Sequence, residues 1–248
     1  MRLASLLLAM GLGLAACAPT PEPPAAPPPD QGVYGARTDA GPDGEPIEIQ
    51  AVRPAYLTER NRRQRVPYSG PEAEGTIVVD PYARFLYHVL GNGEAMRYGV
   101  AVGQAGKNFQ GNATVGRKQA WPSWTPTANM VRTQPELYGP LKNGLPGGVD
   151  NPLGSRALYL YRGGRDTMYR IHGTMDPSSI GKATSAGCIR LFNQDIMDLF
   201  NEVSSGTPVK VRTRAESLAM EGPLVELPNG YLAPEAEVGP AEGAVPAE

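Results

Sequence analysis

Short apolar segments separated by glycine-rich turns dominate the middle of the chain. Residues 76–80 form one such segment, residues 84–90 a second and residues 95–102 a third, with Gly-Asn-Gly at 91–93 between the last two. Runs of this length that are rich in β-branched and aromatic residues and joined by short Gly/Asn turns are typical of antiparallel strands. The pattern predicts a hairpin formed by residues 84–90 and 95–102.

Strand-like segments recur in the second half of the chain. Residues 157–161 and 167–172 predict a second hairpin, linked by residues 162–166, and residues 208–211 predict a last short strand. Residues 111–154 are rich in Gly, Pro and Trp and show little periodicity. We expect this segment to be a long loop, and a loop of this length inside a compact domain usually has a function.

One helix follows these strands. Apolar residues recur there at i, i+3, i+4 and i+7: Ile196, Leu199, Phe200 and Val203. Asn193 is the expected N-cap, and Gly206 ends the pattern, so the helix is expected within residues 193–205. The predicted fold class is therefore mostly β with one or two short helices.

The two ends of the chain differ from the middle in composition. Residues 1–16 have a positive charge near their start and an apolar run too short to span a bilayer, which is typical of a signal peptide. Residues 17–66 are rich in proline and then basic, which predicts an extended tether. Residues 67–213 have the size of one ordinary domain. Residues 214–248 contain seven Glu and are expected to form an acidic Pro/Gly-rich tail.

The net charge of −2 averages the basic front and the acidic end of the chain. A nucleic-acid-binding domain usually shows a clustered basic patch and a high isoelectric point. The charge pattern gives no such signal, and no nucleic-acid partner is expected.

The chain contains two cysteines. Cys17 ends the sequence Leu-Ala-Ala-Cys at the close of the apolar run, which resembles the bacterial lipobox, where the cysteine becomes the lipidated N-terminus. The resemblance implies a periplasmic protein anchored through this lipid, and Ala18 after the cysteine favours the outer membrane. An ordinary secretory cleavage beside a cysteine is the alternative. If Cys17 is lipidated, Cys188 has no intrachain partner, so its thiol is either buried or used.

Cys188 lies among residues that carry chemistry. The candidates form two short stretches: His172, Gly173, Ser185, Gly187, Cys188 and Arg190. A cysteine is nucleophilic as a thiolate, and a neighbouring imidazole accepts its proton. The absence of a side chain at Gly187 allows a tight bend before the nucleophile. The backbone N–H groups of Gly187 and Cys188 are candidates for an oxyanion hole.

These two stretches resemble the L,D-transpeptidase catalytic domain of the YkuD family. The signature of that family is His-Gly at a strand end, followed by Ser/Thr-x-Gly-Cys-hydrophobic-Asn/Arg. The resemblance extends over most of residues 75–212 and includes residues 151–154, and the loop from 116–118 to 121–126 is similar to the Gram-negative branch. It implies a YkuD-like β-sandwich in which the catalytic cysteine lies on a loop before a helix.

The resemblance also implies roles for single residues. Cys188 is the expected nucleophile, which carbapenems acylate in this family, and His172 is the expected base. A backbone carbonyl just after the catalytic histidine orients its ring in the family, and Gly173 occupies that position here. Many members carry His where this chain has Ala186. His172 is then the remaining base, because His88 falls in an early strand.

For two further side chains the sequence leaves two roles open. Arg190 either pairs with a substrate carboxylate or braces the loop through hydrogen bonds to carbonyl groups. Ser185 either caps the loop or contacts the reaction intermediate. No cofactor is expected, and one Cys with one His does not provide the ligands of a zinc site.

The reaction that the resemblance implies is acyl transfer on peptidoglycan tetrapeptide stems. Cys188 attacks the carbonyl after the L-centre of meso-diaminopimelate and expels D-alanine. The thioester then passes to an amine, either of a second diaminopimelate or of a Lys of an outer-membrane lipoprotein, whereas transfer to water gives a hydrolase. A non-catalytic peptidoglycan-binding lipoprotein and a secreted β-domain with an inert buried Cys188 are the alternatives.

Overall fold

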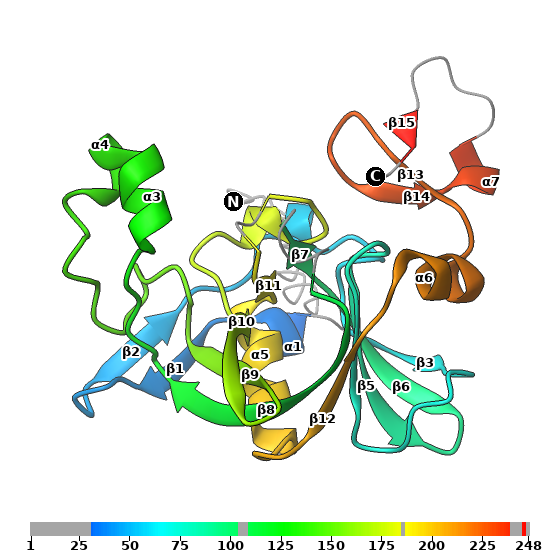
Figure 1. Ribbon diagram of the computed structural model, residues 1–248, viewed down its shortest axis with the longest axis horizontal. Helices are drawn as coiled ribbons and strands as arrows, with labels where there is room; N and C mark the ends of the chain where they lie inside the picture. The colour runs from blue at the N-terminus through cyan, green and yellow to red at the C-terminus, as the bar shows by residue number, and fades with distance from the viewer. Residues whose placement is uncertain (1–30, 104–108, 185–186, 239–244, 247–248) are drawn as a thin grey trace, which may run out of the picture.

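The computed structural model describes residues 31–103, 109–184, 187–238 and 245–246. The prediction of a mostly β fold is confirmed, because ten strands form one mixed sheet in the order β3-β6-β5-β4-β12-β8-β9-β10-β11-β7 (Figure 1). In chain order these strands are β3 (Gln64–Pro67), β4 (Ile77–Asp80), β5 (Phe85–Gly91), β6 (Glu94–Gly99), β7 (Ala101–Val102), β8 (Gly111–Ala120), β9 (Arg156–Arg162), β10 (Arg165–His172), β11 (Ile189–Arg190) and β12 (Pro208–Val211).

The sheet folds over on itself. Strand β6 lies next to one end of the sheet and β7 forms the other end, yet only Val100 separates these two strands in the chain. The continuous chain therefore brings the two ends of the sheet together. The two halves of the sheet face each other across one core, which is the form that the expected sandwich takes.

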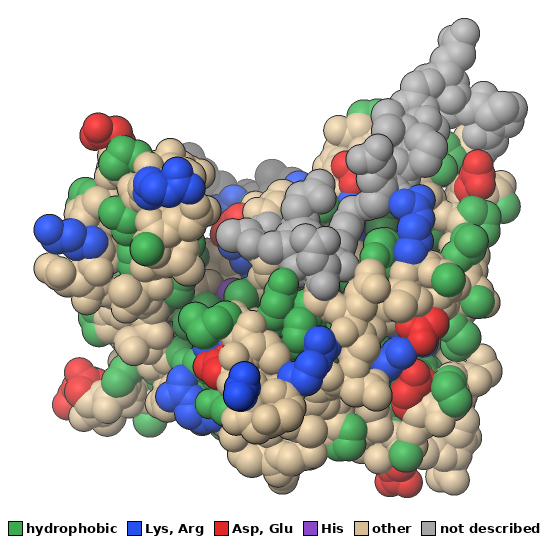
Figure 2. Space-filling view, in the orientation of Figure 1, with side chains coloured by type: hydrophobic (Ala, Val, Ile, Leu, Met, Phe, Trp, Pro, Cys, Tyr) green, Lys and Arg blue, Asp and Glu red, His purple; other side chains and the backbone are tan. Residues whose placement is uncertain are grey.

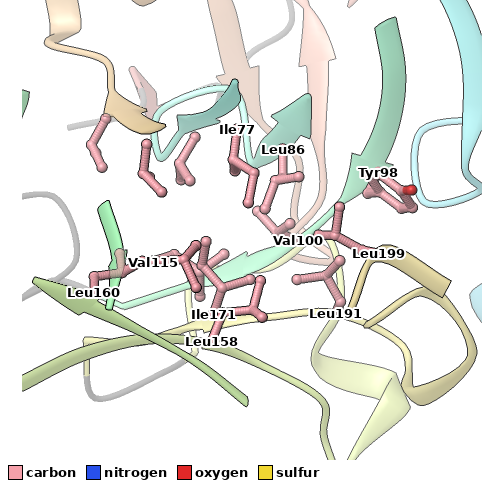
Figure 3. Packing of buried hydrophobic residues seen from close by; sticks show 14 of the residues in the cluster. Ile77, Leu86, Tyr98, Val100, Val115, Leu158, Leu160, Ile171, Leu191 and Leu199 are labelled. Carbon is pink, nitrogen blue, oxygen red and sulfur yellow. The ribbon is translucent and has the colours of Figure 1, made fainter. Parts of the chain in front are cut away.

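Figure 3 shows this core between the two halves. Ile77 and Leu86 come from β4 and β5, Leu158 and Ile171 come from β9 and β10, and all four are fully buried in one cluster. The helix α5 (Asn193–Glu202) adds Leu199 to the same cluster. Burial of a large aliphatic side chain contributes about 1.5 to 3 kcal/mol, so this shared core holds the layers together.

Both predicted hairpins are confirmed, since β5 pairs with β6 and β9 with β10 in antiparallel register. The third predicted strand is divided at Val100, because β7 pairs with β11 rather than with β5. The expected loop at 111–154 is wrong in its first part. There β8 lies between β12 and β9. Only Ala113 and Val115 of β8 are buried, which leaves too few apolar positions for a recognisable alternation.

The remainder of this segment is less regular. It contains the short helices α3 (Ala128–Thr133) and α4 (Pro135–Tyr138), which form a lobe beside the sheet in Figure 1. Trp124 and Leu145 form an isolated bridge within this lobe. The helix α5 begins and ends close to its predicted limits, but its N-cap is Phe192 and not Asn193.

The described part of the expected N-terminal tether is folded onto the domain rather than extended. It contains α1 (Gln31–Tyr34), β1 (Arg37–Ala40), β2 (Pro46–Ile49) and the 3-10 helix η1 (Pro54–Tyr56), followed by β3 of the main sheet. The Tyr34 hydroxyl donates to Asp195 over 3.2 Å, and Arg37 and Arg63 both pair with Asp198 of α5. Because these anchors are single residues in a Pro- and Gly-rich context, no sequence period reveals them.

The described part of the expected acidic tail is also ordered. It contains α6 (Arg214–Glu221), β13 (Leu224–Glu226), β14 (Leu232–Pro234), α7 (Glu235–Val238) and β15 (Val245–Pro246). Arg84 donates to the carbonyl groups of Gly181 and Gly230 and forms an ion pair with Glu226, which joins this segment to the domain. No helix in the described ranges combines the length and the apolar character that crossing a membrane requires.

A buried ion pair between β4 and the end of β12 contributes to stability. Arg212 and Asp80 have 3% and 0% exposed side chains and lie 3.1 Å apart. We expect Asp80→Ala to lower the free energy of unfolding by about 3 kcal/mol, because it removes the fully buried carboxylate of the pair and leaves the guanidinium with Glu221 alone. Urea denaturation measures the change.

The exposed pair between Arg65 and Glu94 provides the control, since its side chains are 62% and 44% exposed. Glu94→Ala is expected to change the free energy of unfolding by less than about 1 kcal/mol. Equal effects of Asp80→Ala and Glu94→Ala would contradict a stabilising role of the buried pair.

Candidate active site

The parallel pairing of β10 and β11 brings the two candidate stretches together. Ile171 lies opposite Ile189, and His172 lies opposite Arg190. Ile171 and Ile189 are buried in the main core. Because side chains alternate along a strand, His172 and Arg190 point to the other face of the pair. Cys188, two residues before Arg190, belongs to the same face.

His172 ends β10 with its ring oriented by the backbone. Its Nδ1 lies 2.6 Å from the carbonyl oxygen of Gly173, so the contact that the resemblance implies for Gly173 is present. The His172 carbonyl in turn accepts from the N–H of Leu191, which fixes the strand end against the segment after β11. With Nδ1 donating to Gly173, the neutral ring has its lone pair on Nε2.

Burial decides the charge of this imidazole. The His172 side chain is almost completely buried, and this burial, with the positive charge of Arg190, lowers its pKa from 6.5 to about 3. Backbone contacts with Gly173 and Leu153 act in the opposite direction without cancelling the effect. His172 is therefore neutral at physiological pH and is able to accept a proton.

Cys188 is half-buried and carries a thiol. Burial of the sulfur raises its pKa above the ordinary value. A hydrogen bond from the backbone of Arg170 and the positive charges of Arg170 and Arg190 act in the opposite direction. Both shifts favour the neutral forms, a thiol at Cys188 and an imidazole at His172, over a thiolate and an imidazolium.

Gly187 and Arg190 flank the candidate nucleophile Cys188 with a backbone bend and a positive charge. Gly187 has φ 147°, a conformation that L-residues rarely adopt, so a side chain there would strain the bend before Cys188. The Nε atom of Arg190 is buried and has no hydrogen-bond partner among the described residues. Buried N–H groups usually have a hydrogen-bond partner. The unpaired Nε therefore favours a role of Arg190 in binding a ligand over a role in bracing the loop.

Asn193 was predicted as an N-cap, but its side chain instead binds the backbone of Ser155 and Thr174. Its side-chain oxygen accepts from the N–H groups of Ser155 and Thr174, and its amide nitrogen donates to the carbonyl of Thr174 over 2.8 Å. These bonds join the start of α5 to the segment that follows His172. The sequence signal for this role is weak, because an asparagine before an apolar period is typical of an N-cap.

Three residues of the sequence interpretation lie outside the described residues. These are Ser185, Ala186 and the predicted lipidation site Cys17. The predicted roles of Ser185 and Cys17 stay predictions. His88, expected as a structural strand residue, lies in β5 with its Nδ1 at 3.1 Å from Glu202.

The order of strand, histidine, cysteine and helix agrees with a known catalytic domain. Residues 74–211 match the YkuD family, L,D-transpeptidase catalytic domain. The chain belongs to this family. The matched residues include β4 to β12 and therefore both His172 and Cys188.

Named relatives and a solved structure are also similar to this chain. "Probable L,D-transpeptidase YbiS" of Escherichia coli K12 is 40% identical over 139 residues, covering 55% of this chain and 44% of the relative. "Probable L,D-transpeptidase ErfK/SrfK" of Salmonella typhimurium LT2 is 37% identical over 150 residues, covering 60% and 47%. A Brucella melitensis protein, whose crystal structure is described as a probable carnitine operon oxidoreductase, is 49% identical with a TM-score of 0.45, covering 62% of this chain and 96% of that one. The chain spans about half the length of the curated relatives it matches.

Proposed function

We propose that this protein is an L,D-transpeptidase that forms a thioester at Cys188 with a peptidoglycan stem peptide and transfers the acyl group to an amine. The observation that carries the proposal is the shared face of β10 and β11. There a buried neutral imidazole, oriented by Gly173, lies on the side of the sheet from which Cys188 projects. Membership of the YkuD family supports the same reaction.

The reaction uses the neutral pair in a defined order. As the Cys188 sulfur attacks the carbonyl after diaminopimelate, Nε2 of His172 accepts the thiol proton. The imidazolium then donates this proton to the departing amine of D-alanine. The N–H groups of Gly187 and Cys188 are proposed to stabilise the oxyanion, and loss of one such donor typically lowers the rate by about 10² to 10³. Deacylation by an amine repeats these steps in reverse.

Incubation of the purified protein with a disaccharide-tetrapeptide tests this function. Mass spectrometry distinguishes three products. A cross-linked dimer indicates transfer to a second diaminopimelate, and a disaccharide-tripeptide indicates transfer to water. Recovery of intact substrate alone, in the presence and absence of a lysine-containing acceptor peptide, would contradict the proposal and favour a binding protein without activity.

We further propose that the protein acts in the periplasm, anchored to the outer membrane by a lipid on Cys17. The Leu-Ala-Ala-Cys sequence that ends the apolar run at the N-terminus supports this anchor. A peptidoglycan substrate requires the same compartment. The amine acceptor then includes diaminopimelate in the cell wall and the Lys of an outer-membrane lipoprotein.

Replacing the predicted lipidation site tests the anchor. Cys17→Ser is expected to release the protein into the soluble periplasmic fraction, because a lipid on Cys17 is the proposed attachment. Immunoblotting of membrane and soluble fractions after a high-salt wash measures the distribution. Ser5→Ala, within the same leader, is the matched control and should leave the protein in the membrane fraction. Continued membrane sedimentation of Cys17→Ser would contradict lipid anchoring.

A further inference from the structure

Four neighbouring segments of the sheet form a row of side chains that ends at the nucleophile. Arg117 of β8 lies opposite Tyr159 of β9, and Tyr159 lies opposite Arg170 of β10. The β10–β11 register places Cys188 beside Arg170, and the hydrogen bond between the Arg170 backbone and Cys188 agrees with this placement. The row thus runs across the strands from Arg117 to Cys188.

This row faces away from the main core. The neighbours of Tyr159 along β9 are Leu158 and Leu160, and both are buried in the main cluster. Tyr159 therefore points to the opposite face, which is the face of His172 and Cys188. In the space-filling view the outline is hollowed between the side with α3 and α4 and the side with β13 and β14 (Figure 2).

Tyr159 is held between two guanidinium groups. The Arg117 guanidinium carbon lies 3.7 Å from the centre of the Tyr159 ring, and that of Arg170 lies 4.3 Å from it. Arg170 also forms two hydrogen bonds with the carboxylate of Asp166, at 2.7 and 2.9 Å. Arg170 is therefore already paired, and its charge is largely balanced by Asp166.

Arg117 differs from Arg170 in its hydrogen bonding. The side chain is exposed, and no hydrogen bond joins its guanidinium to another described residue. Its interactions are the stacking on Tyr159 and a Coulombic effect on Asp166, whose pKa is lowered. Stacking fixes the plane of the guanidinium and leaves its N–H edge directed outward, which is the geometry for a bidentate bond to a carboxylate.

We propose that Arg117, stacked on Tyr159 in the row that leads to Cys188, binds a carboxylate of the acyl-donor peptide. This inference rests on the proposed function, and it names the group that the donor must carry. Arg190 adds positive charge near the nucleophile end of the row and favours an anionic ligand there.

The spacing of the strands sets the position of this carboxylate in the substrate. Neighbouring strands lie about 4.8 Å apart, so the α-carbons of Arg117 and Cys188 are roughly 14 Å apart, and the side chain of Arg117 shortens the gap by lying over Tyr159. An extended peptide advances about 3.3 to 3.6 Å per residue. Once the reach of the Arg117 side chain is subtracted, the gap corresponds to about one or two residues. The carboxylate is therefore placed on the N-terminal side of the attacked diaminopimelate carbonyl, at the second residue of the tetrapeptide.

Binding measurements separate this inference from the proposed reaction. The test uses the Cys188→Ala protein and calorimetric titration with two donor tetrapeptides, one with all carboxylates free and one with the carboxylate of its second residue amidated. Arg117→Gln in this background is expected to weaken binding of the free peptide about tenfold, as for a lost hydrogen-bonded charge pair. It should leave binding of the amidated peptide unchanged. Arg117→Lys is expected to fall between, because it keeps the charge but not the planar fork.

Arg165→Gln is the matched control. Arg165 is exposed at the start of β10, beside the hairpin turn, and its replacement removes the same charge. It should affect neither peptide. Equal affinity of Arg117→Gln and its parent for the free peptide, or an equal loss for both peptides, would overturn the inference. Absence of turnover by the wild-type enzyme contradicts the proposed function instead, and the binding comparison still decides the role of Arg117.

Discussion

Cys188→Ala is expected to eliminate turnover of disaccharide-tetrapeptide while leaving the fold intact. In the proposed reaction the acyl group is carried by the Cys188 sulfur, and an alanine there has no group that forms the thioester. The side chain that is removed is small and half-buried, and the alanine keeps its β-carbon. The cost in stability should therefore stay within about 1 kcal/mol.

Two measurements check this result together. Mass spectrometry of the reaction products gives the activity, and thermal unfolding gives the stability. Ser178→Ala, at a half-buried position of a 3-10 turn (η2, Pro177–Ser179) between the two stretches, is the control and should retain activity. Turnover by Cys188→Ala within a few-fold of wild type would contradict thioester chemistry. Loss of both activity and folding would leave Cys188→Ser as the variant that separates the two effects, because serine keeps the size and is a far poorer nucleophile.

The predictable part of this fold is the part in which one pattern repeats. The hairpins β5–β6 and β9–β10 and the helix α5 have regular apolar periods, and each lies close to its predicted limits. Strand β8 has no regular apolar period. A bulge between Val115 and Arg117 interrupts its pairing with β9. Gly116 occurs there because a β-carbon would lie 2.2 Å from the ring of Tyr161. In a sequence this glycine is read as a loop residue.

The folded ends show a different limitation. Their packing depends on single long-range contacts, such as those of Tyr34 with Asp195 and of Arg84 with Glu226, and these have no sequence period. One local signal was available. Thr213 and Glu216 have the spacing of a capping box, and both reciprocal hydrogen bonds are present at the start of α6.

Residue chemistry and the motif predicted that His172 and Cys188 act together. They did not predict the charge state of either side chain. Sequence alone left open a thiolate–imidazolium pair. Burial of both side chains shifts both groups toward their neutral forms, with the pKa of His172 lowered and that of Cys188 raised. Burial depends on the whole fold, and the positive charge of Arg190 beside the ring depends on the β10–β11 register.

The neutral pair leads to a distinct pH dependence of acylation by a carbapenem. Below its raised pKa Cys188 stays a thiol, and above its lowered pKa His172 stays a neutral base. Between roughly pH 5 and pH 8 neither group changes charge, so the rate of adduct formation by the wild type should be nearly constant. The two apparent values belong to the coupled pair.

Removal of the base should change both the rate and its slope with pH. His172→Gln is expected to lower acylation at neutral pH by about 10² to 10⁴, and the remaining reaction requires the free thiolate. Below the raised pKa of Cys188 the thiolate fraction increases tenfold per pH unit, so the logarithm of the rate should rise with a slope of about one. Intact-protein mass spectrometry of the carbapenem adduct measures both curves.

His88→Gln is the matched control for the base, because it removes the other histidine of the chain, which lies in β5 beside Glu202. Its curve should coincide with that of the wild type. Coincidence of the His172→Gln curve with the wild type would show that His172 does not accept the thiol proton. A wild-type rate that declines on acidification through pH 6.5 would show instead that the imidazole keeps its ordinary pKa, contrary to its burial between the backbone of Gly173 and Leu153. A flat wild-type curve beside a variant curve of unit slope is the result that general-base transfer from a neutral thiol requires.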